Sequence, residues 1–258
     1  AEGRAGEREA EGMPRSWTMQ YLSWFAGMLT GNFGASIRTG LPVLPEVLSV
    51  GLNTLILTIG SLIITLLIAV PIALYSAIRG ANNISWSFTI SSYVLSALPV
   101  FWLGYIVIYL FTHKLGLFPI ALGFSSAGQK YRWLYQLLPI FVLGVGNGTI
   151  SEVIRYLRQE MSRVMAEDYI RLARAKGGSV WKHSFKEGLL IPATEIIASK
   201  IPFILGGAVI VEQVFNWPGM GRMAWQAAQD RDYPVIMGIA ILAAVFVRLG
   251  SLFQRVVY

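Results

Sequence analysis

Five ionisable side chains within or beside long apolar runs are the residues of this chain best suited to chemistry or ion binding. They are Glu152, Glu195, Lys200, Glu212 and Arg248. A Lys or Arg at the bilayer centre costs about 2.5–3.5 kcal/mol on insertion scales, so such a residue normally faces protein or water. The three glutamates fall near the ends of the runs, where water reaches them. Lys200 and Arg248 are therefore the candidate residues for a pathway, although Lys200 is also placed to extend its ammonium group to the cytoplasmic surface.

The sequence lacks the patterns that enzymes and cofactor-binding proteins need. It contains no Cys, which excludes disulfides, thiol catalysis and Cys metal sites, and it has only two His, at 113 and 183. No G-x-x-x-x-G-K-[ST] phosphate-binding loop is present, since Gly144–Gly148 lies in an apolar run with no Lys after it. No Ser-His-Asp set or pair of carboxylates stands out. We therefore expect no catalysis by this chain, and no cofactor or metal bound to it.

Composition places the chain in a membrane. Hydrophobic residues make up 55% and charged residues 14%, whereas about 25% is charged in a typical soluble domain. Each of five apolar runs reaches the roughly 20 residues that a helix needs to cross the hydrocarbon layer. The expected fold is an all-α, polytopic transmembrane helix bundle. The five predicted spans are Leu52–Ala77, Trp86–Phe111, Leu134–Ile154, Ala193–Phe215 and Val235–Phe253.

Two segments follow from this division: an external N-terminal segment, 1–51, and a transmembrane domain, 52–258. Residues 1–51 contain no long apolar run and no signal-peptide pattern. The number of spans is odd, and the sequence begins at Ala1. Two interpretations stay open, a genuine five-span protein and a protein whose first span lies upstream of this sequence. We prefer the second.

Lys and Arg predict the orientation, because cytoplasmic loops carry them in excess. The segment 157–192 contains seven of these residues, whereas the segment 216–233 contains only Arg222 and Arg231, offset by Asp230 and Asp232. The first should be cytoplasmic and the second external. Alternation then places 1–51 and 114–133 outside, and 78–85 and the C-terminus inside.

The cytoplasmic segment predicts helices at the membrane surface. Glu152–Lys176 has apolar residues at helical spacing, and Gly177 then supplies a C-terminal stop. A second short helix, 180–190, should end before Pro192. Ala173 and Gly177 stand at i and i+4 and should form a notched face. Binding to anionic lipid is the alternative role for such a basic surface helix.

The segment 216–233 predicts a small external cap between two spans. Pro218 fixes φ, while Gly219 and Gly221 permit tight turns. Trp217 then has two possible places, the membrane interface, where indole is favoured, or the surface that meets a partner or substrate. Elsewhere, Pro71, Pro99, Pro139 and Pro202 interrupt the spans, either for helix packing or to line a path that opens.

Several motifs resemble one family. DYIRLARAKG, from Asp168 to Gly177, resembles the coupling motif of ABC importer permeases, although Arg171-Leu172 replaces its Glu-Ala. VEQVFNWPGMGR from Val211, Pro99–Gly104 and Gly31–Ser36 are similar to segments of the peptide/nickel branch. The likeness extends from about residue 20 to the end, and Arg255 departs from it. The chain is thus identified as an inner-membrane permease subunit of a peptide/nickel-type ABC importer.

The resemblance implies partners and roles. A second, non-identical permease would complete the pathway, two ATP-binding subunits would carry ATP and Mg, and an extracytoplasmic binding protein would deliver substrate. It also implies a bacterial or archaeal plasma membrane and no nucleic-acid partner. Peptides are the first choice of substrate, with nickel, opines and oligosaccharides known in the wider branch. A gradient-driven secondary transporter or ion channel is the alternative function. The residues expected to couple to the ATPase are Asp168, Arg171, Ala173, Arg174 and Gly177, and those expected to shape the outer cap are Trp217, Pro218, Gly219 and Gly221.

Overall fold

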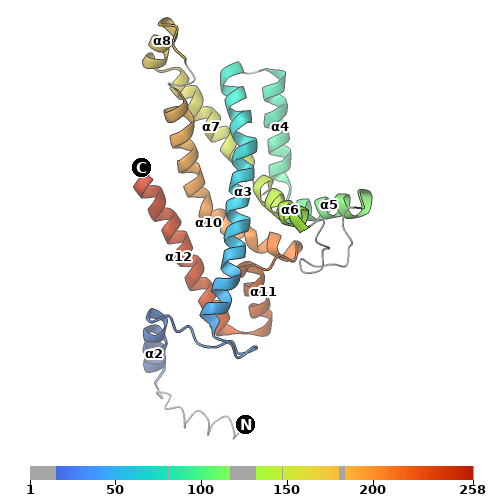
Figure 1. Ribbon diagram of the computed structural model, residues 1–258, viewed down its shortest axis with the longest axis vertical. Helices are drawn as coiled ribbons and strands as arrows, with labels where there is room; N and C mark the ends of the chain where they lie inside the picture. The colour runs from blue at the N-terminus through green and yellow to red at the C-terminus, as the bar shows by residue number, and fades with distance from the viewer. Residues whose placement is uncertain (1–15, 81, 117–131, 147, 180–183, 258) are drawn as a thin grey trace.

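The computed structural model describes residues 16–80, 82–116, 132–146, 148–179 and 184–257, and it gives the backbone alone at 132–135, 197–198, 200–207, 250 and 253–257. Within these ranges the regular elements are all helical, and the single β-bridge joins Ala35 to Pro42. The predicted all-α fold is therefore confirmed. The helices form an elongated bundle, which Figure 1 shows with its long axis vertical.

Helix α3, Val43–Arg79, is the spine of the bundle. Its 37 residues correspond to roughly 55 Å of helix at 1.5 Å per residue. One side carries small and hydroxyl side chains, including the buried Thr54, Ser61 and Thr65, against which neighbouring helices pack closely. Gly80, at φ +68°, ends the helix in the left-handed region that glycine tolerates.

The predicted span Trp86–Phe111 is wrong as a single helix. Helix α4, Asn83–Ala97, and helix α5, Val100–Tyr109, meet at an angle of 100°, and a π-helical turn, Leu110–Lys114, follows α5. Pro99 explains the break, because it has no N–H to donate and it holds the preceding Leu98 in an extended conformation, at ψ 129°.

The predicted span Leu134–Ile154 is also divided. Helix α6, Arg132–Val145, and helix α7, Thr149–Met165, differ in direction by 56°. Gly148 lies between them at φ +78°. The hydroxyl of Thr65 on α3 donates to the Gly144 carbonyl at 2.7 Å, which compensates for the interrupted helical hydrogen bonding.

Helix α10, Ile191–Val214, matches the predicted span Ala193–Phe215 closely, but the expected short helix before it is not separate. A π-helical turn, Lys186–Leu190, runs directly into α10. This wider turn accommodates Pro192, which therefore does not end a helix. The continuous helical segment reaches from Ser184 to Val214.

The expected helix Glu152–Lys176 breaks at Ala166–Glu167, so that α7 is followed by a separate helix α8, Asp168–Ala175. The C-terminal stop at Gly177 is confirmed. Gly177 has φ +70°, its N–H donates to the Arg174 carbonyl at 3.1 Å, and the Gly178 N–H donates to the Ala173 carbonyl at 2.8 Å. This pair of bonds is the Schellman motif.

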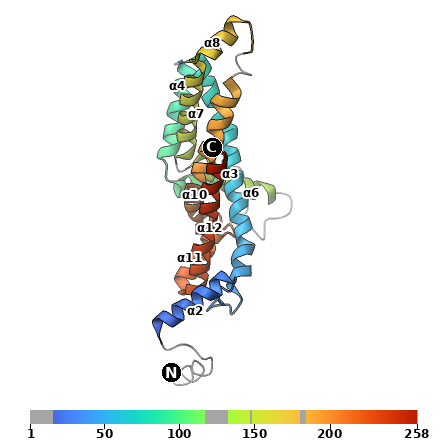
Figure 2. The same cartoon turned by 90° about the vertical axis from the view of Figure 1, so that its left-hand side faces the viewer.

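Three further helices complete the described chain: α2, Trp17–Leu29, α11, Met220–Asp230, and α12, Tyr233–Val257. Both views place α8 at one end of the bundle, and α11 and α2 at the other (Figures 1 and 2). Helix α12 starts beside α11 and runs back along α10 and α3. The described parts of 157–192 and 216–233, predicted to lie on opposite sides of the membrane, therefore lie at opposite ends of the molecule, while most of 114–133 lies outside the described residues.

By length and composition, α3 alone among the described helices passes a test for crossing a membrane, and the number rises to three if each of the two bent pairs counts as one span. A shorter apolar helix covers Tyr233–Leu249. The count of five spans stays a prediction.

Candidate functional site

The coupling segment stands clear of the bundle at the α8 end. Asp168, Arg171, Arg174 and Gly177 are exposed, as an interaction surface requires. Ala173 points inward with Ile170 and is only 8% exposed, so the expected notch of Ala173 and Gly177 is not an open face. The most exposed large apolar residue of this surface is Leu172, at 54%. The ion pair between Asp168 and Arg171, 3.3 Å long, is solvated and contributes little.

A hydrogen bond joins α8 to the segment that leads into α10. The Tyr169 hydroxyl donates to the Glu187 carboxylate at 2.8 Å. Partial burial, followed by this bond, raises the pKa of Tyr169 to about 12, so the phenol stays protonated and remains a donor at neutral pH. This bond joins α8 to the first turns of the continuous helical segment 184–214.

At the other end, Trp217 is part of the core and not of a surface. Its side chain is 2% exposed, and its indole N–H donates to the Asn53 carbonyl of α3 at 3.1 Å. The Asn53 amide donates in turn to the Pro218 carbonyl at 2.8 Å. Both places expected for Trp217, the lipid interface and a partner surface, are therefore wrong. The exposed tryptophan of the outer cap, residues 216–233, is Trp225, at 51%.

Glu212 is fully buried. Its position near the end of an apolar run had predicted instead that water reaches it. Its carboxylate accepts the Thr54 hydroxyl of α3 at 2.7 Å and the Arg222 backbone N–H of α11 at 2.9 Å. Three helices meet at this one side chain. The two glycines of the cap, Gly219 and Gly221, approach it closely.

A second carboxylate attaches the N-terminal segment, predicted to be external, to the cap. Asp232 is buried and accepts the Ser36 hydroxyl at 2.5 Å, together with the backbone N–H groups of Ile37 and Arg38. Burial works to raise the pKa of Asp232, but these hydrogen bonds outweigh it and lower the pKa. The exposed Arg38–Asp230 ion pair, at 3.2 Å, lies alongside.

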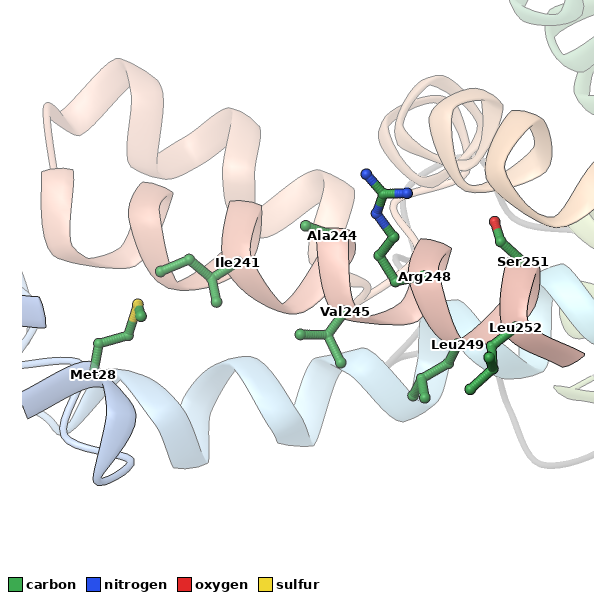
Figure 3. A pocket seen from close by; sticks show the side chains of 8 residues that line it. All are labelled: Met28, Ile241, Ala244, Val245, Arg248, Leu249, Ser251 and Leu252. Carbon is green, nitrogen blue, oxygen red and sulfur yellow. The ribbon is translucent and has the colours of Figure 1, made fainter.

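The two candidate pathway residues are not brought to the cap or to α8. Lys200 belongs to α10, but its side chain lies outside the described residues. Arg248 is exposed on α12, in an open groove of about 600 Å³. Figure 3 shows its guanidinium leaving the helix on the side opposite to Val245 and Leu249. The lining residues are Met28, Ile241, Ala244, Val245, Arg248, Leu249, Ser251 and Leu252.

Glu195, another of the ionisable residues in the spans, accepts a short hydrogen bond from the Tyr156 hydroxyl, which joins α7 to α10. Among the described residues there is no cluster of three or more His, Asp or Glu side chains that could hold a metal ion.

The family described as "binding-protein-dependent transport system inner membrane component" matches residues 69–258. The chain belongs to this family. The permease is 38% identical over 248 residues to the oligopeptide transport system permease protein AppB of Bacillus subtilis, a match that covers 93% of this chain and 78% of that protein.

Two further relatives agree with this assignment. The permease is 33% identical to the probable peptide ABC transporter permease protein y4tP of Sinorhizobium fredii, covering 98% of this chain and 82% of that one. It is 32% identical to the glutathione transport system permease protein GsiC of Salmonella typhi, covering 97% and 80%.

A solved structure, of an amino acid ABC transporter with histidines, matches with a TM-score of 0.58 at 18% identity, covering 82% of this chain and 94% of that one. This likeness supports the fold. The permease is thus an inner-membrane transmembrane subunit of an ABC importer, as its coupling and cap motifs indicated.

Proposed function

We propose that this permease imports peptides, driven by ATP hydrolysis in separate subunits. The observation that carries the proposal is the arrangement of α10. One continuous helical segment starts beside α8, through the Tyr169–Glu187 bond, and ends at the outer cap, through Glu212. Such a helix can carry movement from a cytoplasmic motor to an external gate.

The proposed partners occupy the two ends. The transporter has two ATP-binding subunits, which would carry ATP and Mg. One of them binds the exposed side chains of α8, and Leu172 makes the apolar contact between Arg171 and Arg174. A soluble binding protein meets the outer cap near Trp225. A second, non-identical permease completes the pathway, and membrane lipid surrounds the pair. Neither a cofactor nor nucleic acid has a role in this arrangement.

The names of the relatives support peptides as the substrate class, since they include oligopeptide, peptide and glutathione permeases. Nickel is less well supported, because His113 lies in the turn after α5 and His183 belongs to the segment 157–192, which is predicted to be cytoplasmic. A gradient-driven transporter would use Lys200 or Arg248 as an ion relay, but it would have no use for a coupling helix.

Arg248 is the described pathway candidate. Arg248 is one of the residues that line a mainly apolar groove, its guanidinium points away from Val245 and Leu249, and no described residue forms an ion pair with it. A charge at this depth needs water or an anionic group. If Arg248 faces the pathway, Arg248→Gln should reduce peptide uptake at least about tenfold, the effect of about 1.4 kcal/mol, while Arg248→Lys retains part of it. Equal uptake by Arg248→Gln and the unaltered protein would place Arg248 outside the pathway.

The test of the function is uptake by the reconstituted transporter. The permease, its partner permease, the ATP-binding subunits and the binding protein are placed in liposomes with a labelled peptide outside. We expect uptake to require ATP inside and the binding protein outside, and to be indifferent to proton and sodium gradients. Uptake that follows an ion gradient without ATP would contradict the proposal and favour the secondary transporter.

A further inference from the structure

Helix α11 begins without a capping side chain of its own. Its N-cap residue is Gly219, yet the first N–H groups of a helix have no partner within the helix. Side chains from two other helices provide the acceptors. The Thr54 hydroxyl oxygen of α3 accepts the Met220 N–H at 2.8 Å, and the Glu212 carboxylate of α10 accepts the Arg222 N–H at 2.9 Å.

Thr54 and Glu212 form one connected group. The Thr54 hydroxyl donates to one oxygen of Glu212 at 2.7 Å and accepts from Met220 with its lone pair. Both side chains are buried. A carboxylate at a helix N-terminus is stabilised by the helix dipole, and a buried one requires its hydrogen-bond partners. Neither side chain is replaceable by an apolar one without leaving buried donors of α11 unsatisfied.

The glycines of the cap make room for this carboxylate. A Cβ on Gly219 would lie 2.2 Å from a Glu212 oxygen, although its φ of −114° suits any residue. A Cβ on Gly221 would lie 2.6 Å from the Cα of Val209 in the α10 backbone. Gly219 is therefore needed for the space that Glu212 fills, and Gly221 for the approach of α11 to α10.

We propose that Glu212 is a positioning residue which holds the outer cap on α3 and α10, so that the cap moves with these helices as one unit. The attachment is argued from geometry alone. Its consequence for transport rests on the proposed function.

Thiol labelling tests the attachment, because the chain has no native Cys. Ala227 and Ala228 are neighbours on α11, the first buried at 6% exposure and the second exposed. In the assembled transporter, Ala227→Cys should react slowly with an impermeant thiol reagent and Ala228→Cys rapidly. Adding Glu212→Ala should raise the Ala227→Cys rate at least about tenfold, since a buried donor that loses its acceptor destabilises the seated cap. Glu212→Gln, which keeps one acceptor oxygen, should give an intermediate rate.

Two controls keep this result interpretable. Ala73→Cys, buried in α3 far from the cap, should stay protected in every background, which excludes general unfolding. Thr54→Val removes the bridging hydroxyl at nearly constant volume and should also raise the Ala227→Cys rate. If Ala227→Cys stays protected with both Glu212→Ala and Thr54→Val, while Ala228→Cys still reacts, Glu212 does not hold the cap and the proposal is overturned.

A double-mutant comparison tests the contact itself. Gly219→Ala should abolish peptide uptake in the unaltered background, and Glu212→Ala should reduce it. In the Glu212→Ala background, Gly219→Ala should have little further effect, because the carboxylate it would strike is gone. Gly221→Ala is the matched control, since its clash with the α10 backbone stays in both backgrounds. Additive losses for Gly219→Ala and Glu212→Ala would contradict the contact. Failure of uptake by the unaltered transporter would contradict the proposed function alone, because the labelling rates stand without it.

Discussion

Two tryptophans of the outer cap, Trp217 and Trp225, differ in what surrounds them. Trp217 fills the core between α3 and α10 and donates to a backbone carbonyl, whereas half of Trp225 faces outward. A sequence with a tryptophan beside a Pro-Gly turn suggests a surface position, because such turns usually lie at the surface. The turn residues do not determine whether the indole points outward or into the core. The burial of Trp217 shows that it stabilises the cap and that Trp225 is the residue available to a partner.

Substitution of the two tryptophans should therefore separate stability from coupling. Trp217→Ala removes a large buried side chain, and we expect it to lower the free energy of unfolding by about 3–5 kcal/mol. Trp217→Phe should lower the free energy of unfolding by less than Trp217→Ala does. The lost hydrogen bond should account for about 1 kcal/mol, and the smaller ring adds a further loss of packing. Trp225→Ala should leave thermal stability unchanged and lower the stimulation of ATP hydrolysis by the loaded binding protein. Normal stimulation with Trp225→Ala would remove that residue from the contact.

Asp232 gives a pH-dependent prediction at the same scale. Its lowered pKa means that the carboxylate stabilises the attachment of Ser36–Arg38 at pH values above about 3.9, and that this contribution is lost as the pH falls through the lowered pKa. Hydrogen exchange at the Ile37 and Arg38 amides should therefore be slow at neutral pH. Asp232→Asn should accelerate it by roughly an order of magnitude, the effect of losing a charge-assisted acceptor. Exchange that is equally slow in Asp232→Asn would show that other contacts hold this segment.

At the scale of elements, the continuous segment 184–214 connects the α8 end to the outer cap, while two of the other long apolar runs are bent. The Tyr169–Glu187 bond attaches α8 to its start, and Glu212 attaches the outer cap near its end. Helices α5, α6 and α7 of the two bent pairs contact α10. We infer that α10 transmits movement and that the bent pairs adjust around it.

Breaking the bond at the start of this helix should impair transmission without unfolding the permease. Tyr169 is 38% exposed, so Tyr169→Phe should cost at most about 1 kcal/mol of stability. We expect the ATP-binding subunits to remain bound, while uptake per ATP hydrolysed falls. Glu187→Gln, which keeps an acceptor oxygen for the phenol, is the matched control and should retain most of the coupling. An unchanged ratio of uptake to hydrolysis in Tyr169→Phe would exclude this link from transmission.

The sequence predicted the helices better than their directions. Hydropathy located apolar runs that lie within α3 and α12 and nearly match α10, although α3 begins at Val43, inside the segment 1–51 that was assigned no helix. The Gly177 stop was found because a glycine after a polar last turn has a specific backbone role. Pro99 was expected to interrupt its span, but so were Pro71 and Pro139, which lie inside helices, so the sequence did not show which proline bends the chain. The bend at Gly148 was not placed. Glu212 was set aside because depth along a span says nothing about burial by other helices, and its partners Thr54 and Arg222 are distant in the chain or supply backbone atoms.

At the scale of the whole molecule, the arrangement has two ends with different chemistry. Around α8 the exposed side chains include Arg171, Leu172 and Arg174, while the outer cap exposes Trp225 beside a carboxylate-bound N-terminal segment. Three hydrophobic clusters extend along the bundle between these ends. A permease that joins a cytoplasmic ATPase to an external binding protein must have these two ends on opposite sides of the membrane.

Two single-cysteine variants test that requirement most directly. Ala175→Cys lies at the exposed end of α8 and Ala228→Cys on the exposed face of α11, in a chain that has no other Cys. In intact cells, an impermeant thiol reagent should label Ala228→Cys and leave Ala175→Cys unlabelled until the membrane is opened. Labelling of Ala175→Cys from outside, or of both variants from the same side, would contradict a permease that joins a cytoplasmic ATPase to an external binding protein.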